Sequence, residues 1–306
     1  MPGSAVVAVD VGGTSIKAAV LDDRGTTVRR HDAPTPAAEG PDAVVAAVRQ
    51  AVRDLTGPDV QAVGVVVPGV VDVAVGVARY SANLGWRDVP LGALLAADLG
   101  VPVAIEHDVR AAGHAERVLG RARGVADCLI VVLGTGIAGV VVSGGQHLRG
   151  ATDLAGEIGH VPVYPDGDPC ACGQRGCTET YASAAAIARR YFDRTGRRLT
   201  AEQVAAARST DVAAAQVWDE AVTALGLALA GYAMLLDPSL VVLAGGLSAA
   251  GTALRDPVRA ALAARLVWRP APVVELSPLA GRAGQYGAAL FAWRAAGHEL
   301  GDDWTV

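Results

Sequence analysis

The sequence lacks the features that mark membrane, secreted and nucleic-acid-binding proteins. Its longest apolar stretch, residues 221–236, is short for a membrane span and is interrupted by Thr223 and two glycines. The start of the chain has no basic region ahead of an apolar core, so we expect no secretory signal. The formal net charge of -5 argues against a basic surface for nucleic acid. We therefore expect a cytoplasmic protein that binds neither a membrane nor nucleic acid.

Cysteine is also scarce, and its distribution is uneven. Of the four cysteines, Cys170, Cys172 and Cys177 fall within one polar segment, DPCACGQRGC at 168–177. In a cytoplasmic protein, cysteines more often bind a metal or react than form structural disulfides. The cluster therefore indicates a metal site, with a reduced, solvent-facing group of thiols as the alternative.

The order of the predicted elements indicates a duplicated α/β protein. Residues 5–30 read as strand, glycine turn, strand, turn and strand, and residues 127–150 repeat this pattern. A chain of 306 residues suggests about two domains, and two such units imply a cleft between the halves. The other expected elements are a helix at 41–56, a buried strand in 60–72 that ends at Pro68-Gly69, a loop and helix at 83–100, a strand and helix at 101–120, helices near 182–195, 200–207 and 211–236, a strand, glycine turn and helix from 239, and a final helix at 283–297.

Three glycine-rich turns follow predicted strands: DVGGTSIK at 10–17, GTGIAG at 134–139 and Gly245-Gly246. Backbone N–H groups in such turns can bind phosphate oxygens, because no side chain blocks close approach. Asp10 could also hold the water shell of Mg²⁺, which prefers oxygen ligands. Plain tight hairpins are the alternative, and no Walker A motif is present. The candidate nucleotide-binding residues are Asp10, Gly12, Gly13, Thr14, Lys17, Thr135, Gly136, Gly245 and Gly246.

The second turn also matches the dinucleotide fingerprint G-x-G-x-x-G. That fingerprint requires a helix directly after the turn. Here the turn is followed by VVVSGG, which is β-branched and then broken by glycines, so a hairpin is expected. A strand after Gly139 would exclude an NAD-dependent oxidoreductase.

A series of motifs resembles the ROK family of sugar kinases and repressors over roughly residues 5–290. In order, these motifs are DVGGTSIK, VPGVVD, ANLGWRDVPL, EHDVRAAGHAE, LGTGIAGVVV, GEIGH, CACGQRGC and AGGLS. The resemblance implies an actin-like, ribonuclease H-like α/β fold of two duplicated domains, with ATP and sugar in the cleft between them. The expected domains are a smaller one at 1–118, joined by a C-terminal helix at about 283–306, and a larger one at 119–282 that carries the cysteine loop. The chain is expected to be a homo-oligomer, a dimer or tetramer.

The resemblance also assigns a metal site and a sugar site. His160, Cys170, Cys172 and Cys177 form the ligand set of a closed, structural zinc site. A zinc-bound imidazole keeps its second nitrogen for a hydrogen bond, so zinc would orient His160 toward the sugar. The expected sugar contacts are Gly69, Asn83, His107, Asp108, Glu157, His160 and Glu179.

Asp108 is the candidate catalytic base. It stands at a predicted strand end and helix start in EHDVRAA, where a helix N-cap is the plainer interpretation. As a base it would accept the proton of the sugar hydroxyl that attacks the γ-phosphate of ATP, while Mg²⁺ and backbone donors neutralise charge. The family usually carries E-N-D-x-N here. In this chain His107 and Arg110 replace the two asparagines, so the identity of the sugar is left open.

The expected activity is therefore the ATP- and Mg²⁺-dependent phosphorylation of the primary hydroxyl of a hexose, with glucose as the first choice. An amino sugar, an N-acetylhexosamine or a sugar-like cyclitol is the alternative acceptor. A sugar-responsive ROK regulator is a further alternative. It would need an N-terminal helix-turn-helix domain, for which we expect no room ahead of Asp10.

Overall fold

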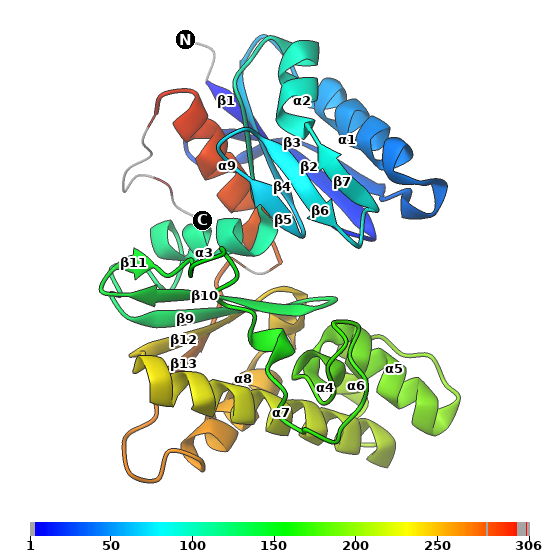
Figure 1. Cartoon of the computed structure of the whole chain (residues 1–306), viewed down its shortest axis with the longest axis vertical. Helices are drawn as coiled ribbons and strands as arrows, with labels where there is room; N and C mark the ends of the chain where they lie inside the picture. The colour runs from blue at the N-terminus through cyan, green and yellow to red at the C-terminus, as the bar shows by residue number, and fades with distance from the viewer. Residues whose placement is uncertain (1–3, 280, 299–303, 305–306) are drawn as a thin grey trace. The chain divides into compact units, whose positions relative to one another are not determined.

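The chain forms two units, and the computed structural model describes residues 4–279, 281–298 and 304. The first unit comprises Met1–Leu119 together with Arg282–Val306, and the second comprises Gly120–Gly281 (Figure 1). Each unit is built on its own five-stranded sheet.

The sheet of the first unit has the strand order β3-β2-β1-β4-β8. The first three strands pair as antiparallel hairpins, whereas β4 and β8 run parallel to β1. These strands are β1 (Ala5–Val11), β2 (Ser15–Asp22), β3 (Thr27–Pro34), β4 (Val60–Val67) and β8 (Val103–His107). Valine-rich β1 and β4 are buried along nearly their whole length, because helices cover both faces of the sheet.

Helix α1 (Pro41–Leu55) and helix α9 (Ala283–Ala295) both pack on this sheet, and they lie on opposite sides of it in Figure 1. The close approach of α9 depends on Gly64 in β4, where a Cβ atom would lie 1.9 Å from the carbonyl oxygen of Ala288. The other helices of this unit are the short 3-10 helix η1 (Ala37–Glu39), α2 (Leu91–Leu99) and α3 (Asp108–Val118).

The C-terminal helix is shorter than expected. It ends at Ala295, whereas the sequence predicted a helix at 283–297 and a helical C-terminal segment of the first domain to about residue 306. The reason is Gly297, whose left-handed φ of 84° cannot continue a helix. Residues 299–303 and 305–306 of the expected helix lie outside the described residues.

A three-stranded sheet in the first unit was not predicted. Its strands are β5 (Val70–Asp72), β6 (Val77–Ser81) and β7 (Trp86–Val89), in the order β5-β6-β7. The prediction for 83–100, a loop leading into a helix, was therefore wrong for β7. Trp86 anchors this strand, since it is fully buried and its Nε1–H donates to the carbonyl oxygen of Pro41 at 3.1 Å.

The sheet of the second unit repeats the design of the first. Its order is β11-β10-β9-β12-β13, with β9–β10 and β10–β11 antiparallel and β12 and β13 parallel to β9. The strands are β9 (Cys128–Leu133), β10 (Ile137–Ser143), β11 (Gln146–His147), β12 (Leu240–Ala244) and β13 (Val273–Leu276). The same sequence of strand directions occurs in both sheets, so the predicted duplication is confirmed.

Strand β10 begins within the GTGIAG turn and pairs antiparallel with β9. No helix follows this turn, so the dinucleotide fingerprint is not met. This observation excludes the NAD-dependent oxidoreductase alternative, as the β-branched residues after Gly139 predicted.

Helices cover the second sheet and enclose its core. They are η2 (Ile158–His160), α4 (Glu179–Ala182), α5 (Ala184–Thr195), α6 (Ala201–Ala207), α7 (Val212–Leu236), η3 (Gly246–Ala250) and α8 (Thr252–Ala263). By length and composition alone, α7 could cross a membrane, but half of its most apolar window is buried inside the protein. It packs against α4, α5, α6 and α8 and carries the buried Trp218, as a core helix does.

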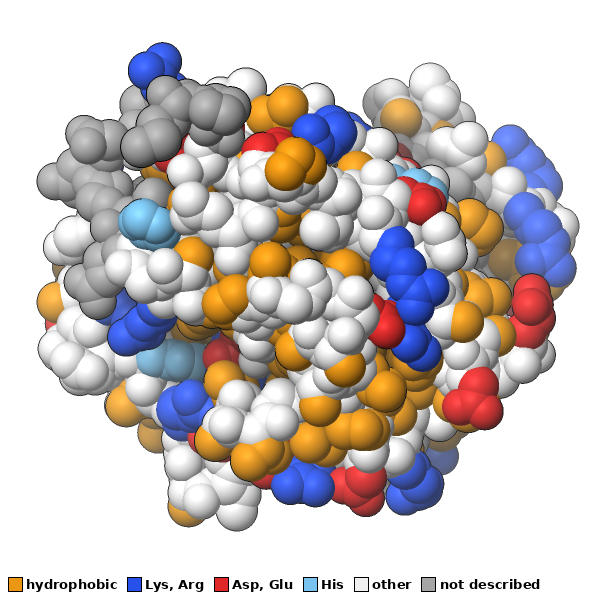
Figure 2. Space-filling model, turned by 90° about the horizontal axis from the view of Figure 1, so that it is seen from above, with side chains coloured by type: hydrophobic (Ala, Val, Ile, Leu, Met, Phe, Trp, Pro, Cys, Tyr) orange, Lys and Arg blue, Asp and Glu red, His pale blue; other side chains and the backbone are white. Residues whose placement is uncertain are grey.

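Charged side chains of both signs are interspersed on the face drawn in Figure 2. Among the described residues visible on that face, Lys and Arg do not merge into one continuous basic surface. The expectation of no nucleic-acid partner stays a prediction.

Candidate active site

The turn between β1 and β2 presents two free backbone donors. The N–H of Gly12 is used within the turn and donates to the carbonyl oxygen of Ser15 at 2.8 Å. Thr35, directly after β3, supports the turn: its Oγ1 donates to the carbonyl oxygen of Gly12 at 2.6 Å, and its N–H donates to that of Thr14 at 3.1 Å. Within the described part of the chain, the N–H groups of Gly13 and Thr14 donate no hydrogen bond. Two adjacent free N–H groups can bind an anion.

The turn between β9 and β10 has the same design. The N–H of Gly134 is used locally and donates to the oxygen of Gly136 at 2.9 Å. The N–H of Ile137, at the end of the turn, donates to Oε2 of Glu179 at 2.7 Å. Over the described residues, the N–H groups of Thr135 and Gly136 have no acceptor. The two positions left free are the two that the sequence proposed for phosphate binding.

The glycines of the third turn serve different purposes. Gly245 has a φ of 85°, and a Cβ atom on it would lie 2.5 Å from the carbonyl oxygen of Leu133. This glycine is therefore required by the fold. At Gly246, which begins η3, a Cβ atom would meet nothing within 4 Å. The fold does not explain Gly246, which leaves room there for a ligand.

Asp10, the penultimate residue of β1, lies near two other charged groups, Lys17 and Asp108. It pairs across the β1–β2 ladder with Lys17. Burial, aided by the nearby charge of Asp108 and opposed by that of Lys17, raises the pKa of Asp10 to about 6. At the start of α9, Gly284 makes room for this carboxylate, since a Cβ atom there would lie 3.0 Å from Oδ2. Two neighbouring carboxylates that repel one another fit a divalent cation with oxygen ligands.

Asp108 is the first residue of α3 rather than its N-cap. The cap position is His107, whose side chain makes no capping hydrogen bond, so the plainer N-cap interpretation of Asp108 is wrong. Oδ1 of Asp108 accepts the N–H of Val109 at 2.7 Å and lies 3.4 Å from Nε2 of His107. Burial raises the pKa of Asp108 above the usual aspartate value, while Arg110 and the backbone donors hold it down. A raised pKa makes this carboxylate a better proton acceptor in its ionised form.

The two departures from the family motif behave differently. Burial, aided by the charge of Arg110 and opposed by that of Glu106, lowers the pKa of His107 to about 4. Its imidazole is therefore neutral near pH 7, and its Nδ1 is buried without a hydrogen-bond partner among the described residues. Arg110 instead turns back to β8, where Oε1 of Glu106 accepts its Nε–H at 2.9 Å and lies 2.8 Å from Nη2. The same oxygen accepts the N–H of His107 at 2.7 Å.

Two further predicted sugar contacts lie in the loops of the first unit. Gly69 has a φ of 105°, and a Cβ atom on it would lie 2.1 Å from the carbonyl oxygen of Tyr80 in β6. Its presence is thus explained by packing. Asn83 is exposed in the β6–β7 loop, next to the first glycine turn. A Cβ atom added to Gly13 would lie 3.2 Å from the Cβ of Asn83. Asn83 is therefore close to the predicted phosphate-binding turn.

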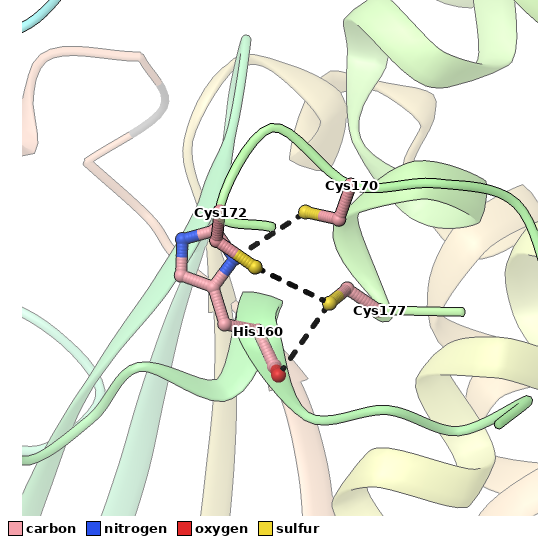
Figure 3. A group of neighbouring side chains, drawn as sticks. All are labelled: His160, Cys170, Cys172 and Cys177. Carbon is pink, nitrogen blue, oxygen red and sulfur yellow. Dashed lines mark hydrogen bonds between the residues drawn. The ribbon is translucent and has the colours of Figure 1, made fainter. Parts of the chain in front are cut away.

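The predicted zinc ligands converge in the second unit (Figure 3). The Sγ atoms of Cys170, Cys172 and Cys177 and a ring nitrogen of His160 all lie within 4.8 Å of one another. The Cys172–Cys177 sulfur pair is 3.7 Å apart, and Nδ1 of His160 is 3.7 Å from Sγ of Cys170. Tetrahedral zinc with bonds of about 2.3 Å to sulfur requires sulfurs roughly 3.8 Å apart. Burial and the neighbouring thiols raise the pKa of Cys177 to about 12, a penalty that a bound cation would offset.

The GEIGH segment lies directly on β10 because of its two glycines. At Gly156, a Cβ atom would lie 2.0 Å from the carbonyl oxygen of Gly139, and at Gly159 it would lie 2.1 Å from that of Ile137. This packing holds Glu157 and His160 beside the strand that follows the second glycine turn. Glu157 is exposed, and His160 points its ring into the thiol cluster.

The structure brings the predicted residues together in two groups, each within its own unit. Asp10, Gly13, Lys17, Asn83 and Asp108 gather in the first unit, and Thr135, Gly136, Glu157, His160 and Glu179 gather in the second. Three contributors were missed by the sequence analysis: Glu106, Ile137 and Gly284. Only Gly284 left a signal, as a glycine in the first turn of a predicted helix. Ile137 acts through its backbone N–H, which its side chain cannot reveal.

Comparison with known proteins gives consistent matches along the chain. The ROK family model matches residues 6–295. A glucokinase of Streptomyces coelicolor is 34% identical over 94% of this chain and 96% of its own length. The crystal structure of a ROK family glucokinase from Streptomyces griseus, in complex with glucose and AMPPNP, superposes with a TM-score of 0.85 at 32% identity and covers 95% of this chain and 100% of that one. An N-acetylmannosamine kinase of Citrobacter koseri is 37% identical over 60% of this chain and 62% of its own.

These matches confirm the predicted actin-like, ribonuclease H-like fold, which the repeated strand order of the two sheets had already indicated. The motifs that suggested the relationship, from the first glycine turn to AGGLS, all lie within the matched range. This chain belongs to the ROK family.

Proposed function

We propose that this protein transfers the γ-phosphoryl group of ATP to the primary hydroxyl of a hexose, with glucose as the preferred acceptor. The observation that carries the proposal is the likeness, over almost the whole chain, to a ROK glucokinase solved with glucose and AMPPNP. The geometry of the site supports it: a buried aspartate begins α3, and two glycine turns each present a pair of N–H groups without an acceptor among the described residues.

In the proposed reaction, the ionised carboxylate of Asp108 accepts the proton of the sugar's primary hydroxyl. The hydroxyl oxygen forms a bond to the γ-phosphorus, the bond to the β–γ bridging oxygen breaks, and ADP leaves with the electron pair. The free N–H groups of Gly13, Thr14, Thr135 and Gly136 hold phosphate oxygens, and Lys17 adds positive charge. Mg²⁺, with Asp10 bound to its water shell, would neutralise charge on the transferring phosphates.

We assign sugar contacts within each unit separately. Asn83 and His107 supply neutral hydrogen-bonding groups, and Glu157 and Glu179 supply carboxylates that accept from hydroxyls. Gly69, which packing against Tyr80 requires, is assigned a sugar contact through its backbone. His160 takes part through the ring nitrogen that does not face the thiols. Zinc, held by His160, Cys170, Cys172 and Cys177, would fix the orientation of that ring and take no part in the chemistry. We place the enzyme in the cytoplasm as a homo-oligomer.

N-acetylmannosamine or another amino sugar is the second candidate acceptor. The specific observation in its favour is His107, which replaces an asparagine of the family motif with a bulkier, neutral ring beside the proposed base. The likeness to an N-acetylmannosamine kinase over part of the chain agrees with this alternative.

A panel of sugars with ATP and Mg²⁺, followed by ADP release, tests the proposal. We expect the highest kcat/KM with glucose, lower values with its epimers and with N-acetylmannosamine, and none without Mg²⁺. ADP release that no sugar stimulates would contradict a sugar kinase. A clear preference for N-acetylmannosamine would replace glucose with the second candidate.

A further inference from the structure

We propose that Glu179 couples the sugar site to the nucleotide turn: its carboxylate is fixed by a backbone N–H of the β9–β10 turn, so that sugar affinity depends on the shape of that turn. The inference rests on the proposed function, which assigns Glu179 to the sugar and the turn to a phosphate. It adds a physical connection between the two sites within the second unit.

The two oxygens of this carboxylate have different environments. Oε2 accepts the N–H of Ile137 at 2.7 Å. Within the described residues, Oε1 accepts no hydrogen bond, and the side chain is only partly buried. One oxygen is thus held by the turn and the other is available to a hydroxyl.

Gly136 creates the space for this contact. A Cβ atom at this position would lie 2.6 Å from Oε2 and 3.4 Å from Cδ of Glu179. The φ of Gly136 is not in the left-handed region, so its backbone does not demand glycine. Position 136 therefore lacks a side chain because the Glu179 carboxylate occupies the space that its Cβ would need.

The backbone that carries Glu179 is fixed from the other side. Both the N–H and Oγ1 of Thr178 donate to the carbonyl oxygen of Val161, at 3.0 and 3.1 Å. Oγ1 of Thr180 donates to the oxygen of Cys177 at 2.7 Å. These bonds tie the start of α4 to the segment that carries the predicted metal ligands. The carboxylate therefore cannot follow the sugar freely if its partner in the turn is lost.

The coupling has a direction that can be measured. The phosphate-binding N–H groups of Thr135 and Gly136 are distinct from that of Ile137, so a nucleotide need not compete with Glu179 for its donor. Any change in the turn that displaces Oε2 also displaces Oε1. By thermodynamic reciprocity, a nucleotide that orders the turn raises sugar affinity, and sugar raises nucleotide affinity by the same factor.

The test is calorimetric titration of glucose into the whole protein without nucleotide, so that turnover plays no part. Gly136→Ala displaces the flexible end of Glu179 and should weaken glucose binding about tenfold, the scale of one hydrogen bond to a charged group. Gly134→Ala is the matched control in the same turn. The nearest atom to a Cβ there is 4.0 Å away, and its φ is also outside the left-handed region. It should change glucose affinity less than twofold.

A double-mutant cycle shows whether Gly136→Ala acts on glucose binding through Glu179. In a Glu179→Ala background, Gly136→Ala should have less than a twofold further effect on glucose affinity, because the group it displaces is gone. An equal effect in both backgrounds, or no effect of Gly136→Ala in the wild type, overturns the coupling while leaving the kinase function intact. Thermal unfolding of each variant identifies loss of fold. A wild-type protein that binds neither glucose nor N-acetylmannosamine and forms no ADP with either overturns the proposed function, and this inference with it.

Discussion

Nε2 of His107 lies 3.4 Å from Oδ1 of Asp108, the carboxylate that we propose as the base. Because the imidazole is neutral, only one of its nitrogens carries a proton. A proton on Nε2 faces Asp108 and leaves Nδ1 as an acceptor, which is buried and unpartnered among the described residues. His107 can therefore orient the base through Nε2. For Nδ1 to accept from a sugar hydroxyl, the buried atom would first have to become exposed.

This relationship predicts the pH dependence of the reaction. Burial raises the pKa of Asp108 above its ordinary 3.8, and the base works only when ionised, so kcat/KM should fall as the pH drops through this raised pKa. His107, whose pKa lies near 4, stays neutral above about pH 5 and should not contribute. The measurement is kcat/KM for glucose from pH 4 to 9 for the wild type and His107→Asn. If the fall of kcat/KM at low pH disappears in His107→Asn, the titrating group is the imidazole of His107 and not Asp108.

His107→Asn should change the preference among sugars. The substitution restores the amide usual in the family and moves the acceptor and donor to different positions. A site that binds a hydroxyl by hydrogen bonds discriminates strongly between sugars that place this hydroxyl differently. Packing alone separates similar substrates by about 1–3 kcal/mol. We expect kcat/KM for glucose, its epimers and amino sugars to change in rank. Rates that all scale by one factor would show that His107 does not read the sugar.

Arg110→Asn should act on stability instead of sugar preference. The Arg110 and Glu106 side chains are only 14% and 9% exposed, and removing the guanidinium leaves a buried carboxylate unpaired. Breaking a buried pair costs about 3 kcal/mol. Thermal unfolding should therefore begin at a lower temperature, with the ranking of sugars unchanged. Arg110→Lys keeps the positive charge but loses the paired nitrogens of the guanidinium group, so its loss of stability should be smaller than that of Arg110→Asn. A variant as stable as the wild type would show that the pair contributes nothing.

The purified protein should contain about one zinc per chain, held by the four-ligand group. Cys172→Ala removes one ligand and should lose the metal, while Cys128→Ala, in β9, should retain it. Metal analysis and thermal unfolding with and without a chelator measure both effects. Zinc-free wild-type protein whose stability a chelator leaves unchanged would refute the site.

The sequence predicted the parts of the fold that depend on local patterns. Valine-rich strands broken by glycines indicated the hairpins of both sheets, and the repeat at 127–150 predicted the duplication. β7 was missed because its exposed Arg87 and Asp88 read as a loop, although Trp86 anchors it to a distant carbonyl group.

The sequence predicted those parts of the candidate site whose chemistry follows from the type of residue. It could not predict the parts that depend on a contact between residues far apart in the chain. The cysteine loop and the glycine turns were readable from composition and spacing. The contact between Glu179 and Ile137 joins residues 42 positions apart through a backbone N–H, and nothing in either side chain signals it. The return of Arg110 to Glu106 follows ordinary i,i+4 geometry, but only burial gives the pair its importance.

Product analysis with the wild type and Asp108→Asn tests the central claim most directly. Each protein is incubated with ATP, Mg²⁺ and either glucose or 6-deoxyglucose, and ADP and sugar phosphate are quantified. The wild type should form equal amounts of ADP and glucose 6-phosphate, and no phosphorylated 6-deoxyglucose. Asp108→Asn should bind glucose with similar affinity but turn over about 10²–10⁴-fold more slowly, because an amide cannot accept the proton. Phosphorylation of 6-deoxyglucose, or near-normal turnover by Asp108→Asn, would contradict the account.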